Sequence, residues 1–152
     1  MKYRCEIEIE RPVDEVVRLF DDPENMKKWM PGLESFEPVS GEPGRVGATS
    51  RLKFDMNGRK IEMIETITSR NLPEEFSGTY ETAGVFNLVQ NRFEDIDGGT
   101  KWVADNEFRF TSLPMKLMAF FMPGAFKKET MKHLKAFKEF AESAEAAREE
   151  EE

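Results

Sequence analysis

Apolar and polar positions alternate along most of the first 110 residues, and this pattern predicts a protein built mainly of β-strands. In Lys2–Glu10 every second residue from Tyr3 to Ile9 is apolar and the residues between them are charged, which is typical of a strand with one buried face. Similar patterns predict further strands at Leu33–Ser40, Val46–Met56, Arg59–Ser69, Glu75–Thr82, Val85–Ile96 and Thr100–Phe110. The clearest turn signal is Asn57-Gly58, because both central residues of a tight hairpin turn need positive φ.

Helical spacing appears first between the first two strands. Pro12 suits the first turn of a short helix, whose inward side is expected to carry Val13, Val16, Val17 and Phe20. A second short helix is expected at Glu24–Met30, with Met26, Trp29 and Met30 as its apolar side.

The last third of the chain, from about Ser112 to Arg148, predicts one long amphipathic helix. Its apolar residues recur at steps of three, four and seven, which places them on one stripe: Phe126, Leu134, Phe137, Phe140, Ala141 and Ala144. Pro123-Gly124 interrupts the pattern, and a proline inside a helix costs roughly 3 kcal/mol. We therefore expect a kink or break there.

Together these elements predict an α+β helix-grip fold. Hairpin-linked strands form an antiparallel sheet, and the apolar face of that sheet must be buried. The C-terminal helix is the element long enough to cover it, so we expect a strongly bent sheet of about seven strands wrapped around this helix. The length predicts one domain over residues 1–148, followed by a disordered acidic tail at residues 149–152.

Composition excludes several classes of function. The net charge of −8 argues against nucleic acid as a partner and against an anionic membrane surface. The chain has one cysteine, Cys5, and one histidine, His133, so we expect no disulfide, no metal site and no cofactor. The longest apolar stretch, Leu117–Phe126, is too short to span a bilayer. We expect a cytoplasmic protein, monomeric or homodimeric, without stable membrane insertion.

Four polar side chains are predicted to face the interior: Glu65, Asn87, Asn91 and Asn106. An unsatisfied buried polar group costs about 1–3 kcal/mol, so these groups must bond to each other, to water or to a ligand. One interpretation is a satisfied polar cluster in a solid core. The other is a hollow interior with an apolar wall and polar anchors, which is how ligand pockets are generally built.

Several short segments in a fixed order then suggest a family. They are Arg11-Pro12 after the opening strand, Asp21-Asp22-Pro23, Trp29-Met30-Pro31-Gly32-Leu33, Gly44-Arg45-Val46-Gly47, Ile67 six residues before Pro73, and Gly98-Gly99-Thr100-Lys101. This order resembles the START-like, or Bet v 1-like, superfamily, in its branch of polyketide cyclase/dehydrase and lipid-transport proteins. The resemblance implies a deep apolar cavity between sheet and helix, with hydrophobic small molecules as ligands. It implies no catalytic residue.

The leading hypothesis is therefore a protein that binds a lipid, polyketide, quinone or similar molecule inside the fold. The expected ligand-binding residues are Phe54, Met63, Glu65, Tyr80, Asn87, Asn91, Trp102, Asn106, Phe108, Met122, Phe126 and Phe137. The first alternative is a cyclase or dehydratase in which Glu65 moves a proton, since burial raises the pKa of a carboxyl group. The second is a protein-interaction module that acts through the C-terminal helix.

Three features have alternative interpretations. The apolar cluster around Phe120 is interpreted as core, and the alternative is a gate or a surface for a partner or membrane. Trp29 and Met30 either form the opposite lip of the cavity or pack under the edge of the sheet. His133 is interpreted as a boundary residue rather than as a general base.

Overall fold

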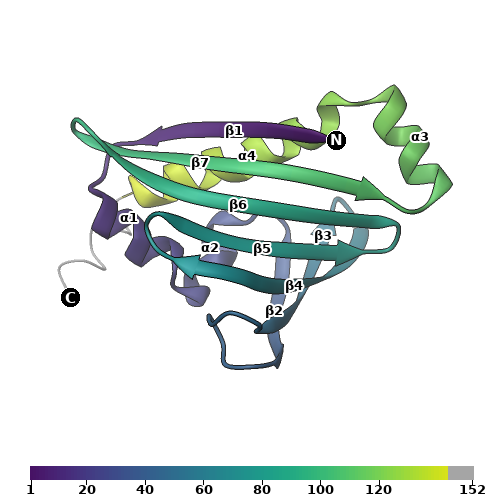
Figure 1. The fold of residues 1–152 in the computed structure, drawn as a ribbon, viewed down its shortest axis with the longest axis horizontal. Helices are drawn as coiled ribbons and strands as arrows, with labels where there is room; N and C mark the ends of the chain where they lie inside the picture. Colours follow the sequence, from purple (N-terminus) through teal and green to yellow (C-terminus); the bar gives the residue numbers. More distant parts are fainter. Residues whose placement is uncertain (144–152) are drawn as a thin grey trace.

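Seven strands form one antiparallel sheet in the order β1-β7-β6-β5-β4-β3-β2, in a computed structural model that describes residues 1–143 (Figure 1). The strands are β1 (Lys2–Ile9), β2 (Leu33–Ser40), β3 (Thr49–Met56), β4 (Arg59–Asn71), β5 (Glu75–Thr82), β6 (Val85–Ile96) and β7 (Gly99–Phe110). All strands from β2 to β7 pair with their neighbours in sequence, and β1 adds to the outer edge of β7. This arrangement confirms the predicted α+β architecture.

The hairpin between β3 and β4 forms where the sequence predicts it. Asn57 and Gly58 have φ values of 57° and 88°, the left-handed conformations that this turn requires. The hairpin fixes the pairing of Leu52 with Met63 and of Ser50 with Glu65. Since alternate residues share a face, Glu65 lies on the same side of the sheet as the buried Leu52 and Phe54.

The helices lie behind the sheet or beyond its ends in the view of Figure 1. They are α1 (Val13–Phe20), the 3₁₀ turn η1 (Pro23–Asn25), α2 (Met26–Trp29), α3 (Leu113–Phe121) and α4 (Gly124–Ala141). α4 lies closest to β1 and α2, so it is anchored along one edge of the sheet. α3 extends beyond the end of β7 and is separate from the body of α4 (Figure 1).

The core consists of two apolar clusters rather than one. The first joins β1, β6, β7, α1, α2 and α4 through Cys5, Ile9, Val16, Leu19, Trp29, Phe93, Trp102, Ala104, Leu134, Phe137, Phe140 and Ala141. The second joins α2, β2 and β3 through Met26, Leu33, Leu52 and Phe54, with Met63 and Tyr80 packed against it. Met30 packs against both clusters, and the strands between them carry the interior polar groups.

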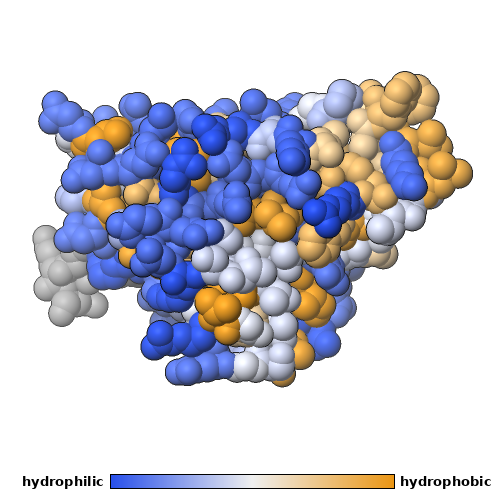
Figure 2. All heavy atoms as spheres, viewed as in Figure 1, coloured by the Kyte–Doolittle hydropathy of each residue, from blue (hydrophilic) through white to orange (hydrophobic). Residues whose placement is uncertain are grey.

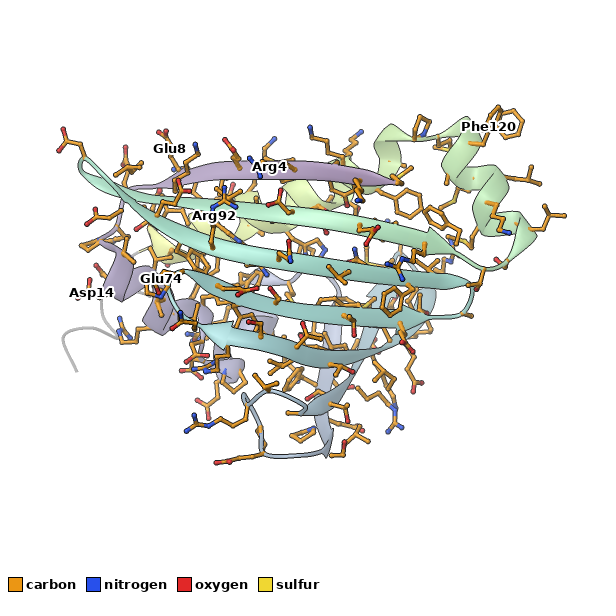
Figure 3. All side chains as sticks on the ribbon, viewed as in Figure 1. Arg4, Glu8, Asp14, Glu74, Arg92 and Phe120 are labelled. Carbon is orange, nitrogen blue, oxygen red and sulfur yellow. The ribbon has the colours of Figure 1, made fainter. Side chains whose placement is uncertain are left out.

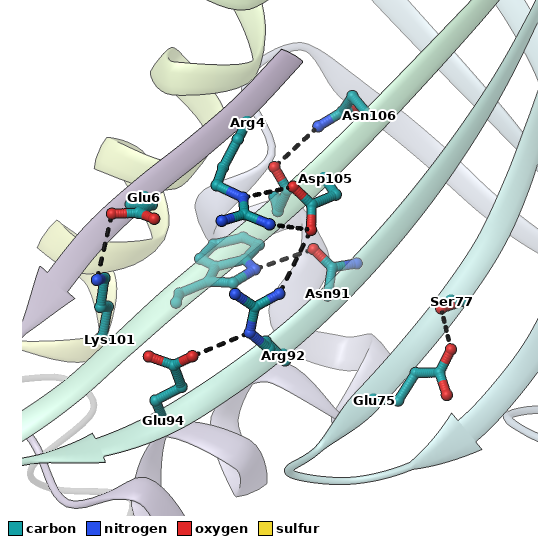
Figure 4. Close-up of polar contacts among 12 residues, drawn as sticks. Arg4, Glu6, Glu75, Ser77, Asn91, Arg92, Glu94, Lys101, Asp105 and Asn106 are labelled. Atoms are coloured by element: carbon teal, nitrogen blue, oxygen red, sulfur yellow. Dashed lines mark hydrogen bonds and ion pairs between the residues drawn. The ribbon is translucent and has the colours of Figure 1, made fainter. Parts of the chain in front are cut away.

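The outer face of the sheet is covered by ion pairs, as the alternation of charged residues predicts. Arg4 on β1 and Arg92 on β6 both bind Asp105 on β7, at 2.7 Å and 3.3 Å (Figure 4). Arg92 also pairs with Glu94 at 2.9 Å. Because solvent screens these exposed pairs, they contribute little to stability, and their main effect is to keep this face polar.

The C-terminal helical region is broken into two helices. α3 ends at Phe121, Met122 has φ −131° and ψ 60°, and α4 begins at Gly124, which agrees with the expected break at Pro123. α4 ends at Ala141. Ala144 and Arg148 of the predicted stripe and helix, and the predicted tail at residues 149–152, lie outside the described residues.

Some predicted burials are wrong. Val46 precedes β3 in a loop and is 61% exposed, because β3 starts only at Thr49. Phe120, Phe121 and Met122 do not join the core. Trp29 packs inside, with its ring 5.1 Å from that of Phe137, so it is a core residue rather than a lip.

Candidate functional site

The central polar pair of the interior is Glu65 on β4 and Tyr80 on β5. The two residues are direct partners across the strands, and the Tyr80 hydroxyl donates a hydrogen bond of 2.7 Å to Glu65 Oε2. Glu65 is 8% exposed. A carboxylate and a phenol therefore meet on the inner face of the sheet, beside the apolar second cluster.

Burial controls the ionisation of this pair. Loss of solvation raises the pKa of Glu65, and the hydrogen bond from Tyr80 only partly opposes this rise. Burial and the neighbouring Glu65 charge hold the pKa of Tyr80 well above 10.0. Tyr80 therefore keeps its proton at neutral pH, whereas Glu65 is a carboxyl whose proton affinity is increased, as proton transfer near neutral pH requires.

Asn91 and Trp102 form a second polar contact on the inner face. The Trp102 indole donates to Asn91 Oδ1 at 2.9 Å, and Asn91 Nδ2 donates to the Phe76 carbonyl at 3.2 Å. Asn91 is buried, and its bonds to a side chain and to the backbone of β5 satisfy much of its polarity (Figure 4). This contact fits a structural role for Asn91.

Asn87 and Asn106 form a third, weaker contact. Asn87 Nδ2 donates to the Glu107 carbonyl at 3.2 Å and approaches Asn106 Oδ1 at 3.5 Å. Asn106 is buried and its amide donates to the Ala104 carbonyl at 3.4 Å, whereas Asn87 is half-buried. These long bonds leave both amides able to form shorter ones with a ligand or with water.

The residues predicted to form the apolar wall of the site lie in three separate groups. Phe54 and Met63 belong to the second cluster, and Trp102 and Phe137 to the first. Phe108 and Phe126, with ring centroids 4.9 Å apart, belong to a third group of rings together with Phe110 and Tyr3. This group joins β7 to the start of α4. Met122 is 58% exposed at the break between α3 and α4, so the structure places it outside this interior set.

Tyr3 and Trp29 are two interior residues that the sequence analysis did not include in the site. The Tyr3 hydroxyl contacts Thr130 Oγ1 at 2.6 Å and donates to the Phe126 carbonyl at 3.1 Å, which joins β1 to α4. Trp29 Nε1 is buried without a hydrogen-bond partner among the described residues. Both residues could have been recognised from the sequence, because each is an aromatic residue with a hydrogen-bonding group at a position predicted to be buried.

Two surface hollows lie away from the Glu65–Tyr80 pair. One of about 800 Å³ lies beside α1 and the turn between β6 and β7, and is lined by Pro12, Val13, Asp14, Val17, Pro73, Asp95, Ile96, Gly98 and Gly99. The other, of about 430 Å³, includes Asn106 and Tyr3. Asn106 is the one predicted site residue that lines either of them.

The described residues offer neither a metal site nor a membrane span. Within residues 1–143 no three His, Cys, Asp or Glu side chains are grouped so as to hold a metal ion. None of the helices in this part of the chain has the length and apolar character needed to cross a bilayer. His133 is half-buried on α4, and burial lowers its pKa below 6.5, so it is neutral at pH 7.

Comparison with known proteins assigns the chain to a family. The family model for polyketide cyclase / dehydrase and lipid transport proteins matches residues 2–142. The chain belongs to this family. A search of curated proteins finds no match.

Several solved structures share the fold of this chain at low sequence identity. A protein from Thermus thermophilus is 21% identical, with a TM-score of 0.76 over 93% of this chain and 97% of that chain. The Zhui aromatase/cyclase from Streptomyces is 13% identical, with a TM-score of 0.72 over 93% of both chains. Major latex-like protein 151 from Panax ginseng is 11% identical, with a TM-score of 0.75 over 94% and 98%. At these identities the likeness concerns the fold.

Proposed function

We propose that this protein binds a hydrophobic small molecule between the inner face of β4–β7 and α4, with the polar end of the molecule beside Glu65 and Tyr80. The observation that carries the proposal is a buried carboxyl–phenol pair on the inner face, next to the second core cluster and separate from the first. Such a combination of an apolar wall and few polar anchors is typical of ligand sites.

The packing of α4 supports this position. α4 lies closest to β1 and α2 rather than to the middle strands. Several side chains of the inner face of the sheet are only half-buried: Met63, Tyr80, Asn87 and Phe108. Tyr80 is among these half-buried side chains, and its hydroxyl is the donor to Glu65.

The chemistry of the pair defines the polar end of the ligand. A second anion beside Glu65 would be repelled in a poorly solvated site, so a neutral hydroxyl or carbonyl group fits better than a carboxylate. A ligand hydroxyl can donate to the free oxygen of Glu65, and a carbonyl can accept from Glu65 when it is protonated. We therefore expect a neutral alcohol, phenol or ketone to bind more tightly than the matching acid.

One observation favours a cyclase or dehydratase as the second candidate. The raised pKa of Glu65, with Tyr80 at 2.7 Å, provides a carboxyl able to take or give a proton next to a phenol. The family includes cyclases by name, and one relative in fold is an aromatase/cyclase. On this candidate, Glu65→Gln abolishes turnover of a polyketide-like substrate and leaves binding in place.

A matched pair of variants tests the binding site. Met63→Trp fills the inner face next to Tyr80, whereas Glu62→Trp adds the same ring to the outer face of β4. Native mass spectrometry of the purified protein with 1-decanol should show a bound molecule in the wild type and in Glu62→Trp, and at least a tenfold loss in Met63→Trp. Equal binding by the two variants would contradict the proposed position.

A further inference from the structure

Helix α3 has an apolar face that points away from the protein. Met115, Met118 and Ala119 are half-buried on its inner side. Leu113, Leu117, Phe120 and Phe121 are spaced by four, three and one residues, which places them together on the opposite side of the helix. α3 is therefore apolar on both sides, although the protein contacts only one of them.

The outer side is exposed over its whole length. Phe120 is 78% and Phe121 73% exposed, and Leu113 and Met122 are also exposed. In Figure 2 a hydrophobic region covers the place where Figure 1 shows α3, at one end of the molecule. Figure 3 shows Phe120 projecting outward from this helix. An exposed group of large apolar residues at one site marks an interaction surface rather than random exposure.

The charged residues of the segment that carries this face are all positive. No Asp or Glu occurs between Phe108 and Lys128, and the exposed Lys116, Lys127 and Lys128 belong to this segment. The whole chain has a net charge of −8, so the apolar face lies in the basic part of an acidic protein. The overall charge predicted repulsion from anionic membranes, whereas the segment that carries the exposed phenylalanines holds only positive charges.

A second copy of the chain is a poor occupant of this face. A two-fold interface places the same patch on both sides, so the lysines of one copy would meet those of the other without an acidic partner from this segment. A surface that is itself anionic and accepts phenylalanine and leucine side chains fits better. An anionic lipid bilayer has both properties.

We propose that α3 is a docking surface for an anionic lipid bilayer. The helix lies in the headgroup region with Leu113, Leu117, Phe120 and Phe121 toward the acyl chains, and the lysines contact the lipid phosphates. Its length of nine residues allows adsorption and not spanning. The proposal does not depend on the identity of an internal ligand, because the exposed face and its charges belong to α3 and the start of α4.

Flotation with lipid vesicles tests the proposal. The wild type should bind vesicles of phosphatidylcholine and phosphatidylglycerol in a two-to-one ratio, more weakly as salt is added, and should not bind vesicles of phosphatidylcholine alone. Phe120→Ser with Phe121→Ser should reduce binding at least tenfold. Lys116→Ala and Lys128→Ala should each weaken it about fivefold.

The matched control removes apolar surface elsewhere. Val39 and Val46 are also exposed, at β2 and the loop that follows it, so Val39→Ser with Val46→Ser should leave vesicle binding unchanged. Equal binding to both lipid compositions, or equal losses in the control variant, would overturn the proposal. So would a lipid-free dimer that the Phe120 and Phe121 substitutions dissociate, since this would assign the face to a second copy. Circular dichroism and urea unfolding confirm that each variant is folded.

Discussion

Tyr80 and Glu65 face each other across β5 and β4, and the Tyr80 hydroxyl donates to Glu65 Oε2 at 2.7 Å. The pair connects the fold to the proposed function, because the hairpin register that places Glu65 inside also places a phenol next to it. Each group changes the ionisation of the other. Perturbing either residue therefore has consequences for stability and for pH dependence.

Glu65→Gln should change how stability depends on pH. The folded protein holds the Glu65 proton more tightly than the unfolded chain, whose carboxyl has a pKa of 4.5. The free energy of unfolding that Glu65 contributes therefore falls as pH rises from 4.5 through the folded pKa. The Gln side chain of Glu65→Gln does not ionise, so the stability of this variant should not fall in this way. Its free energy of unfolding should exceed that of the wild type at pH 7 and equal it at pH 4. Urea unfolding across this range measures the difference. Glu62→Gln, at an exposed position, is the control, and parallel pH profiles for the wild type and Glu65→Gln would contradict the prediction.

Tyr80→Phe should raise the pKa of Glu65 further, because the hydrogen bond from Tyr80 is the interaction that lowers it. The substitution also leaves a buried carboxyl with one bond fewer, which costs about 1–3 kcal/mol at neutral pH. A carbon-13 NMR titration of the glutamate carboxyls follows the pKa directly. A lower Glu65 pKa in Tyr80→Phe would show that the hydrogen bond from Tyr80 does not favour the carboxylate form of Glu65.

Asn91→Leu should destabilise the protein through Trp102. The substitution removes the acceptor of the Trp102 indole N–H and the donor to the Phe76 carbonyl, at a cost of about 1–3 kcal/mol. In a Trp102→Phe background the same substitution should cost less, because no indole N–H is left unpaired. A double-mutant cycle by urea unfolding measures the coupling. Additive losses would mean that the Asn91–Trp102 bond does not stabilise the fold.

Tyr3→Phe should loosen the start of α4. The Tyr3 hydroxyl contacts Thr130 and the Phe126 carbonyl, and losing these bonds should cost about 0.5–1.5 kcal/mol. Amide hydrogen exchange should become faster around Phe126–Thr130 and stay unchanged in β3, which serves as an internal control. A uniform increase over the whole chain would indicate global destabilisation instead.

The fold could be predicted because most strands have one charged and one apolar face. Local structure is determined within a few residues by the alternation in Lys2–Ile9, by the Asn57-Gly58 turn and by the proline at position 123. Helix α1 was predicted less completely. Leu19 is fully buried although it was left out of the inward stripe, because a short helix between two layers buries a wider arc than one stripe.

The candidate site was harder to predict because it depends on contacts between strands. Glu65 and Tyr80 were both expected to face inward, but their pairing depends on the register of β4 and β5, which includes a bulge between Ile67 and Ser69. The exposure of Phe120 and Phe121 could not be predicted from the sequence either, because hydrophobicity does not indicate whether a helix packs against the rest of the protein. Only the path of the chain after β7 shows that α3 extends beyond the sheet.

The most direct test of the proposed function follows the nine methionines of the protein by methyl NMR during titration with 1-decanol. Met30, Met56 and Met63 pack against the second core cluster beside Tyr80, whereas Met115, Met118 and Met122 belong to α3 and the break after it. The account predicts saturable shifts of the Met30, Met56 and Met63 signals, weaker for decanoate than for decanol. Shifts confined to Met115, Met118 and Met122, or no saturable shift at all, would contradict it.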